Sequence, residues 1–173
     1  MFDVEMNSNV SSAVISGMDL YLDTTSSTHY EVWVKPGSWQ NVDKTNPEYF
    51  KGFHQLSHGT IEGKGLCKAN SLKSCAFSTI PIQDFQDITL SKGGAWRAAF
   101  YVTLNTDSML LRNGEGSSKH KMANVVQSSN DEFQVFYGAG VLTYPLQFAD
   151  PVTDVRNNKG FLGRLWYKDI SKA

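Results

Sequence analysis

Apolar and polar residues alternate along most of the chain, most clearly over residues 94–105. Side chains of a β-strand point alternately to its two faces, so every second residue shares a face. One face of this segment is wholly apolar: Trp96, Ala98, Phe100, Val102 and Leu104. The other face is mixed and includes Arg97 and Tyr101. This pattern predicts a central strand with one face in the core.

The same period of two recurs in short segments separated by Gly, Pro, Asn and Ser turn residues. The predicted strands cover residues 2–6, 13–22, 29–35, 49–56, 59–66, 76–82, 88–90, 109–112, 120–127, 132–137, 144–148 and 160–168. No stretch of ten or more residues has an apolar stripe at helical spacing. Many short strands with regular turns favour a two-sheet antiparallel β-sandwich, jelly-roll-like, with an immunoglobulin-like sandwich as the alternative. We expect one domain over residues 1–173, with its terminal strands paired to one another.

Composition narrows the classes of partner. The 173 residues carry 16 basic and 17 acidic side chains, a net charge of -1, which argues against binding to nucleic acid. No apolar run reaches the length of a membrane helix, so we expect no membrane insertion. Ser, Thr, Asn and Gln fill the polar positions, as in many extracellular β-proteins. Met1 leads straight into a strand without a signal peptide. We therefore interpret the chain as a module of a longer secreted precursor, with a cytosolic start as the alternative.

Two cysteines, Cys67 and Cys75, enclose the polar segment CKANSLKSC. A local disulfide is sterically reasonable there and would add roughly 2–3 kcal/mol by loop closure. With two thiols and no nearby Cys or His set, a zinc site is not expected. The predicted disulfide favours an oxidising compartment, outside the cell or at its surface.

Catalytic and metal chemistry have little support in the sequence. His54 and His58 share a spacing with HExxH, but the segment HQLSH lacks the glutamate and its pattern is that of a strand and turn. No nucleophile elbow, phosphate loop or dinucleotide fingerprint occurs, so we expect no enzyme and no cofactor. One candidate for calcium remains, formed by Asp150, Asp154 and Asn157 with the neighbouring Asn158. Asp and Asn also favour turns, which is the simpler explanation of this cluster.

Aromatic residues on the polar faces of strands are the main candidates for binding. Trp33, Tyr101 and Phe136 occupy equivalent faces of three predicted strands, and Arg97 lies beside Tyr101. If these strands are neighbours, the residues form an aromatic and polar surface on which a sugar could stack, with Trp39 at its edge. The alternative is that a loop or a second molecule covers this face. Trp96 and Trp166 are predicted to be buried structural residues.

Several motifs carry a family resemblance: FDV near the start, EVWVKPGSW, AAFYVTL, LLRNGEG, EFQVFYGAGV and the closing GFLGRLWY. Together they resemble a β-sandwich module of secreted and cell-surface proteins from marine microalgae and bacteria. The resemblance implies a secreted, non-enzymatic module, and it transfers no site residues. CKANSLKSC lies outside the pattern, so the disulfide would be particular to this chain.

Two functions therefore follow as predictions. The first is an extracellular binding or adhesion module that recognises a glycan or another matrix component. The second is a structural protein that self-assembles into a layer or shell through the faces or edges of its sheets.

Overall fold

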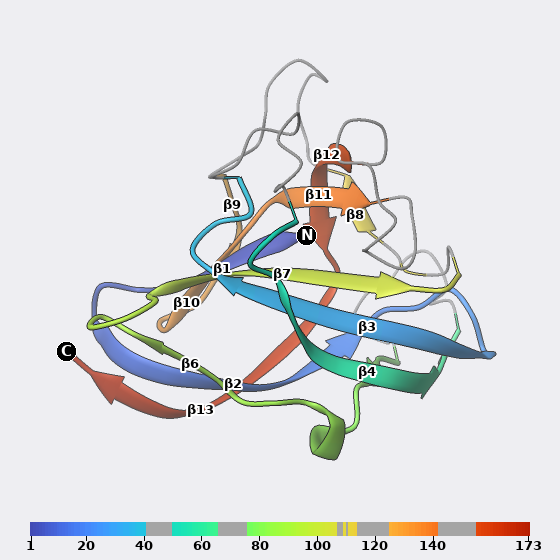
Figure 1. Cartoon of the computed structure of the whole chain (residues 1–173), viewed down its shortest axis with the longest axis horizontal. Helices are drawn as coiled ribbons and strands as arrows, with labels where there is room; N and C mark the ends of the chain where they lie inside the picture. Colours follow the sequence, from blue (N-terminus) through green and yellow to red (C-terminus); the bar gives the residue numbers. More distant parts are fainter. Residues whose placement is uncertain (41–49, 66–75, 107–108, 110, 114–124, 142–154) are drawn as a thin grey trace.

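A computed structural model describes residues 1–40, 50–65, 76–106, 109, 111–113, 125–141 and 155–173. Within these ranges the chain is almost entirely antiparallel β-structure in packed sheets, with one 3-10 turn, η2 (Ile82–Asp84) (Figure 1). The predicted all-β sandwich is confirmed.

The larger sheet has six strands in the order β4-β3-β7-β1-β10-β9. Their bounds are β4 (His54–Glu62), β3 (Ser27–Pro36), β7 (Arg97–Leu104), β1 (Phe2–Met6), β10 (Phe133–Phe136) and β9 (Val126–Ser129). β7 pairs with β3 on one side and with β1 on the other. The segment singled out in the sequence as a central strand is therefore central.

The smaller sheet is built around β2. Its strands are β13 (Gly163–Lys172), β2 (Val10–Leu20), β5 (Ser78–Thr79) and β6 (Ile88–Ser91). β2 pairs with β13 along one edge and with β5 and then β6 along the other. In chain order β1 belongs to the larger sheet, β2 to the smaller, β3 and β4 to the larger, and β5 and β6 to the smaller. This repeated crossing is the jelly-roll-like feature of the prediction.

Three further strands form a small sheet near one end of the sandwich, in the order β11-β12-β8 (Figure 1). They are β11 (Gly138–Val141), β12 (Val155–Phe161) and β8 (Leu111–Asn113). Only Leu162 separates β12 from β13, so the chain runs from this sheet directly into the smaller one. The single final strand predicted over 160–168 is therefore two strands in different sheets.

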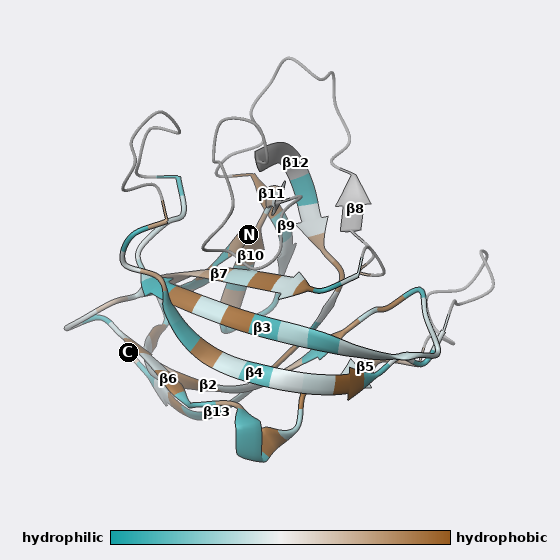
Figure 2. Ribbon diagram, turned by 45° about the vertical axis from the view of Figure 1, so that its right-hand side comes forward, coloured by the Kyte–Doolittle hydropathy of each residue, from teal (hydrophilic) through white to brown (hydrophobic). Residues whose placement is uncertain are grey.

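The core lies between the two principal sheets and uses the apolar faces that the alternation predicted. Figure 2 shows the hydropathy alternating along β3 and β7. From β7 the core receives Ala98, Phe100, Val102 and Leu104, and from β3 it receives Tyr30, Val32 and Val34. Complete burial of a side chain of this size contributes about 1.5–3 kcal/mol to folding. Burial of these apolar side chains holds the two sheets against each other.

The sandwich is closed along one side and open along the other. On the β4 side, Ile80 and Phe85 from the connection between β5 and β6 are buried in the core beside Leu56. The backbone amide of Gln86 also donates to the carbonyl of Leu56 across 3.4 Å. On the opposite side, β9 and β10 face β13 across a pocket lined from both sheets. The candidate site therefore lies on the open side, between β9, β10 and β13.

Two predictions about strand pairing were wrong. The terminal strands do not pair with one another: β1 lies between β7 and β10, and β13 pairs with β2. The predicted strands 49–56 and 59–66 contain one strand, β4, which continues through the expected Ser57-His58 turn. Extended backbone at Gly59, with φ of 159°, allows this continuation. The predicted strand 144–148 lies outside the described residues.

Both tryptophans predicted to be buried are half-exposed. Trp96 is 50% exposed because β7 begins at Arg97, so Trp96 lies in the preceding turn, where the alternation of faces does not extend. Trp166 is 51% exposed because it lies on the outer face of β13. There its ring packs on Gly17, and its Nε1 donates to Asp19 Oδ1 across 3.1 Å. The side chains of β13 do alternate between its two faces, but Leu165 and Tyr167, not Trp166, face inward.

Candidate ligand-binding site

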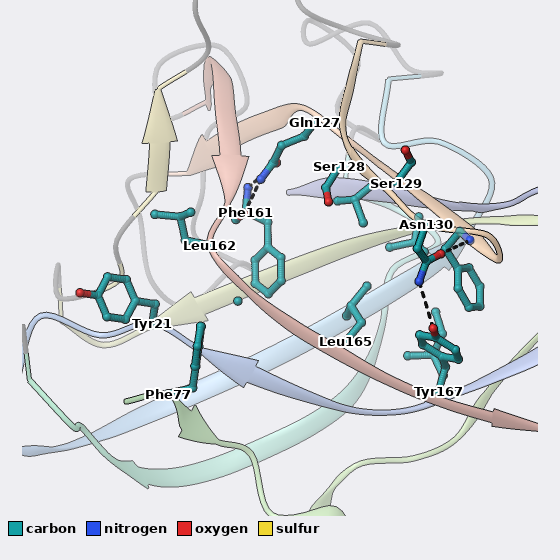
Figure 3. Close-up of a pocket in the computed structure, with 15 residues that line it drawn as sticks. Tyr21, Phe77, Gln127, Ser128, Ser129, Asn130, Phe161, Leu162, Leu165 and Tyr167 are labelled. Atoms are coloured by element: carbon teal, nitrogen blue, oxygen red, sulfur yellow. Dashed lines mark hydrogen bonds between the residues drawn. The ribbon is translucent and has the colours of Figure 1, made fainter. Parts of the chain in front are cut away.

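A pocket of about 420 Å³ lies between the two principal sheets, and we call it the inter-sheet pocket (Figure 3). Its apolar lining comes from β1, β2, β10, β12 and β13: Val4, Ile15, Phe133, Val135, Phe161 and Leu165. Concave, mostly apolar cavities of a few hundred Å³ are typical small-molecule sites. The open side of the sandwich is therefore the best-formed candidate site among the described residues.

β13 forms one wall of the inter-sheet pocket through its alternation. Leu165 and Tyr167 line the pocket, whereas Trp166 between them lies on the outer face of the sheet. From the facing sheet, the Phe133 ring meets the Tyr167 ring edge-on with centroids 4.9 Å apart. The sequence GRLWYK therefore gives β13 one face for the pocket and one for solvent.

Aromatic rings mark both ends of the pocket. Tyr21 and Phe77 lie at the end opposite Asn130 and Tyr167 (Figure 3). The Tyr21 and Phe77 rings are tilted against each other with centroids 6.0 Å apart. The Arg164 guanidinium lies 4.1 Å from the centroid of the Phe77 ring. The site is thus elongated, with β13 running between its two ends.

Asn130 organises the end near Tyr167. Its Oδ1 accepts hydrogen bonds from the backbone amides of Glu132, at 3.0 Å, and Phe133, at 2.7 Å. Its Nδ2 donates to Tyr167 Oη across 3.0 Å. Asn side chains commonly hold turns by bonding to amides further along the chain. Here the same amide group also connects the β9–β10 turn to β13, and so joins the two sheets.

Gln127 connects β9 to β12 at the upper wall of the pocket. Its Nε2 donates to the carbonyl of Phe161 at 2.6 Å, and its Oε1 accepts from the amide of Phe161 at 2.9 Å. The side-chain amide thus imitates one pair of sheet hydrogen bonds. Gly160 makes this approach possible, because a Cβ there would lie 2.8 Å from Gln127 Oε1.

The pocket has a neutral lining. No Asp, Glu, Lys, Arg or His is found among the described residues that line it. Glu132 lies just beyond, where its Oε2 accepts from Tyr167 Oη at 3.3 Å and its Oε1 meets Lys172 Nζ at 3.2 Å. The negative charge is thus already opposed by a lysine. The electrostatics of the site suit a ligand without formal charge.

The aromatic residues predicted to bind a ligand lie together on the outer face of the larger sheet. Trp33 is paired with Tyr101 in the register of β3 and β7, and β10 brings Phe136 to the same sheet. This face is covered, however: Tyr101 is 1% exposed, and Phe136 and Trp39 are each 6% exposed. Trp39 packs with Tyr101, Ala99 and Met1 in a second apolar cluster. Of the two interpretations of these aromatics, the structure favours a covered face, so an open sugar platform is not formed.

A buried carboxylate holds this cover in place. Asp3 is completely buried, and its Oδ2 lies 2.6 Å from Nη2 of Arg97. The same carboxylate accepts from the hydroxyl of Ser38 and from the backbone amide of Trp39 at 3.1 Å. Arg97, predicted as a ligand contact, instead lies over the Phe136 ring at 4.4 Å and reaches Glu5 at 3.2 Å. Its role in the described residues is therefore to organise the covered face.

Burial on this face changes the acidity of several groups. Desolvation raises the pKa of Glu5 even though Arg97 opposes the change. Desolvation lowers the pKa of Lys35, and Asp3 opposes the change only in part. It also lowers the pKa of the Met1 amino group to about 5. In each case loss of water around the charged form is the main cause. Lys35 and the Met1 amino group are buried in this poorly hydrated layer, whereas Glu5 lies at its partly exposed margin.

The remaining predicted sites fall largely outside the described residues. Cys67 and Cys75, the predicted disulfide, lie in the undescribed range 66–75, and Asp150 and Asp154 lie in 142–154. Asn157 belongs to β12, where it is paired with Ala139. Among the described residues, no group of three or more His, Cys, Asp or Glu side chains could hold a metal. In the same part of the chain, no helix is long and apolar enough to cross a membrane.

The residues that form the inter-sheet pocket were not identified from the sequence. Leu165 and Tyr167 were within a predicted strand, but the prediction that Trp166 is buried assigned the wrong face of this strand to the core. A usable signal was the alternation of Phe161, Gly163, Leu165 and Tyr167. Asn130 also stands in a turn position before a strand, where Asn is common. Its bond to Tyr167 spans 37 residues and has no local signature.

Comparisons with protein-family models, curated proteins and solved structures find no match for this chain. The family resemblance noted from the sequence motifs therefore stays a prediction. What the fold and pocket define on their own is a β-sandwich domain with a neutral, mainly apolar site between its sheets.

Proposed function

We propose that the chain is a non-catalytic binding module that holds a small ligand in the inter-sheet pocket. The observation that carries this proposal is the pocket of about 420 Å³ lined from both sheets by apolar side chains. Its polar neighbours Gln127 and Asn130 are held in place by hydrogen bonds to the protein. A preformed cavity with oriented polar groups at its margin favours reversible binding.

A glycan-adhesion function has less support than this pocket. The sugar-binding surface expected from the sequence depended on exposed rings at Trp33, Tyr101 and Phe136. Tyr101 and Phe136 are buried, and the segment containing Trp39 packs over Tyr101. A sugar could stack there only after this cover had moved and the bonds of Asp3 to Ser38 and Trp39 had broken.

Self-assembly through a sheet edge also has less support. β13 is ten residues long and lies at the end of the strand order of its sheet. Its register shifts at three places, and Asp169 has a left-handed backbone with φ of 52°. Bulges and charged side chains on an edge strand oppose pairing with another molecule. Lys168 and Asp169 supply such charges on β13.

The proposal is tested by a thermal-shift screen of the purified chain against small molecules of several chemical classes. Leu165→Trp fills the pocket from β13, and Lys168→Ala is the matched control on the outer face of the same strand. We expect ligands that raise the melting temperature of the unsubstituted chain and of Lys168→Ala but not of Leu165→Trp. Ligands that act equally on all three proteins would place binding elsewhere and overturn the proposal.

A further inference from the structure

We infer that the inter-sheet pocket takes an uncharged, mainly hydrocarbon ligand that carries one hydroxyl or carbonyl group. This inference rests on the proposed function, because it assumes that the pocket is the binding site. It goes further by naming the chemical class of the ligand. Three properties of the described lining carry it: its charge, the state of its polar groups and its size.

Charge is the first property. A carboxylate or ammonium group that enters an apolar cavity loses its hydration. The free energy of this loss is large unless a group of opposite charge in the cavity compensates it. The described lining has no charged side chain. Beyond it, Glu132 already faces Lys172, and Arg164 stacks on Phe77. A charged ligand would therefore lack a partner within the pocket.

The polar groups at the pocket margin are the second property. Both the Nε2 and the Oε1 of Gln127 are hydrogen-bonded to the backbone of Phe161. Asn130 uses its amide on the β9–β10 turn and on Tyr167, whose hydroxyl donates to Glu132. Ser128 is an exposed hydroxyl residue of the lining at the β9 edge, where it is paired with the pocket residue Val135. Ser129 is paired with Gln134, so its hydroxyl lies on the opposite face of the sheet (Figure 3). Polar recognition is therefore concentrated at one edge of the site.

This arrangement excludes strongly hydroxylated ligands. A saccharide carries a hydroxyl on almost every carbon, and each buried hydroxyl without a partner costs about 1–3 kcal/mol. The walls formed by Val135, Phe161 and Leu165 offer no side-chain partner for such groups. A ligand with a hydrocarbon body and one polar end leaves no such group unpaired when that end lies beside Ser128.

Size and shape are the third property. At about 30 Å³ for each small group, a volume of about 420 Å³ holds roughly 14 non-hydrogen atoms. The site runs from Tyr21 and Phe77 at one end to Asn130 and Tyr167 at the other (Figure 3). A linear alcohol such as dodecan-1-ol has this size and shape, with its hydroxyl at one end.

The inference is tested by competition against a neutral fluorescent probe, N-phenyl-1-naphthylamine, bound to the full chain. Dodecan-1-ol, dodecanoate and maltotetraose are compared as competitors at neutral pH. We expect dodecan-1-ol to displace the probe, dodecanoate to be weaker by about tenfold or more, and maltotetraose to have no effect. Leu165→Trp should abolish probe binding, and Lys168→Ala should preserve it.

The outcomes separate the inference from the proposed function. If dodecanoate or maltotetraose binds as well as dodecan-1-ol, and Leu165→Trp abolishes this binding, the pocket is the site and the ligand class is wrong. If the probe binds Leu165→Trp as well as the unsubstituted chain, the proposed function is wrong. The competitor series on the unsubstituted chain requires no variant to fold.

A charge-introducing variant tests the reasoning about charge directly. Ser128→Arg places a guanidinium at the exposed edge of the pocket, where it can pair with a carboxylate. We expect it to strengthen dodecanoate binding by about tenfold while leaving dodecan-1-ol nearly unchanged. An equal change for both ligands would contradict the assignment of this edge to the polar end of the ligand.

Discussion

The side-chain amide of Asn130 donates to the hydroxyl of Tyr167 across 3.0 Å and so joins the two sheets at one end of the pocket. The same asparagine holds the β9–β10 turn through the amides of Glu132 and Phe133. One residue thus sets both the shape of a turn and the separation of two sheets.

Asn130→Ala is expected to destabilise the chain by about 1–3 kcal/mol, because it removes the turn bonds and the link to Tyr167 together. Tyr167→Phe removes only the hydroxyl and should cost about 1 kcal/mol or less. Urea unfolding followed by circular dichroism measures both values. Equal losses in the two variants would mean that the turn bonds of Asn130 contribute nothing.

Asp3→Ala should cost about 3–5 kcal/mol, because it leaves Arg97 in a largely buried position with its closest partner removed. The matched control is Asp87→Ala. Asp87 forms an equally short contact with Lys168, 2.7 Å, but both side chains are about half-exposed. This control should leave the urea midpoint almost unchanged, since exposed ion pairs contribute little. A similar loss in both variants would contradict the role assigned to burial.

Lys35→Met is expected to stabilise the chain by about 1 kcal/mol at neutral pH, because the buried ammonium loses hydration and the thioether does not. Burial lowers the pKa of Lys35 in the folded state, so the native lysine releases its proton before the unfolded one does. The unsubstituted chain therefore gains stability as the pH rises through the window just below the ordinary lysine pKa of 10.5.

The advantage of Lys35→Met should accordingly shrink across that window of pH. Chemical unfolding of both proteins from neutral to alkaline pH measures the difference. A difference that stays constant over the whole range would show that the charge of Lys35 does not matter to folding.

Gly160→Ala should destabilise the chain by about 1–3 kcal/mol through steric overlap. A Cβ at this position would lie 2.8 Å from Gln127 Oε1 and 3.1 Å from the Tyr137 ring, so the Gln127–Phe161 connection has to move. Gly93→Ala is the control, because a Cβ at Gly93 meets nothing within 4 Å. Its effect should stay within about 0.5 kcal/mol. Melting temperatures of the two variants decide between local overlap and a general cost of replacing glycine.

The chain is expected to be monomeric in sedimentation experiments at high protein concentration. Bulges and charges along β13 oppose pairing of its edge, and Trp166 is anchored to Asp19 on its own sheet. Trp166→Ala should leave the sedimentation coefficient unchanged. Concentration-dependent association that Trp166→Ala removes would instead support the self-assembling alternative.

The local pattern of residues was sufficient to predict the strands and their faces. Alternation in RAAFYVTL correctly placed Phe100 toward the core, and in HYEVWVK and RAAFYVTL it placed Trp33 and Tyr101 on the opposite side. This succeeded because the period of a strand depends only on neighbouring residues. The same rule failed at Trp96, which lies before the strand begins, and at Trp166, where the phase was assigned wrongly.

Whether a face is exposed depends on what packs over it, and here only the tertiary structure decided. The alternation put Tyr101 and Phe136 on one side of a sheet, but it could not show what covers them. Trp39, whose backbone amide is held by Asp3, packs against Tyr101, and Arg97 lies over the Phe136 ring. The pocket likewise depends on contacts between residues far apart in the chain, such as Asn130 with Tyr167. Sequence alone determined the β-sandwich, because the alternation of apolar and polar residues along each strand marks its core face. The covered face and the open side arose from long-range contacts, which leave no periodic signal.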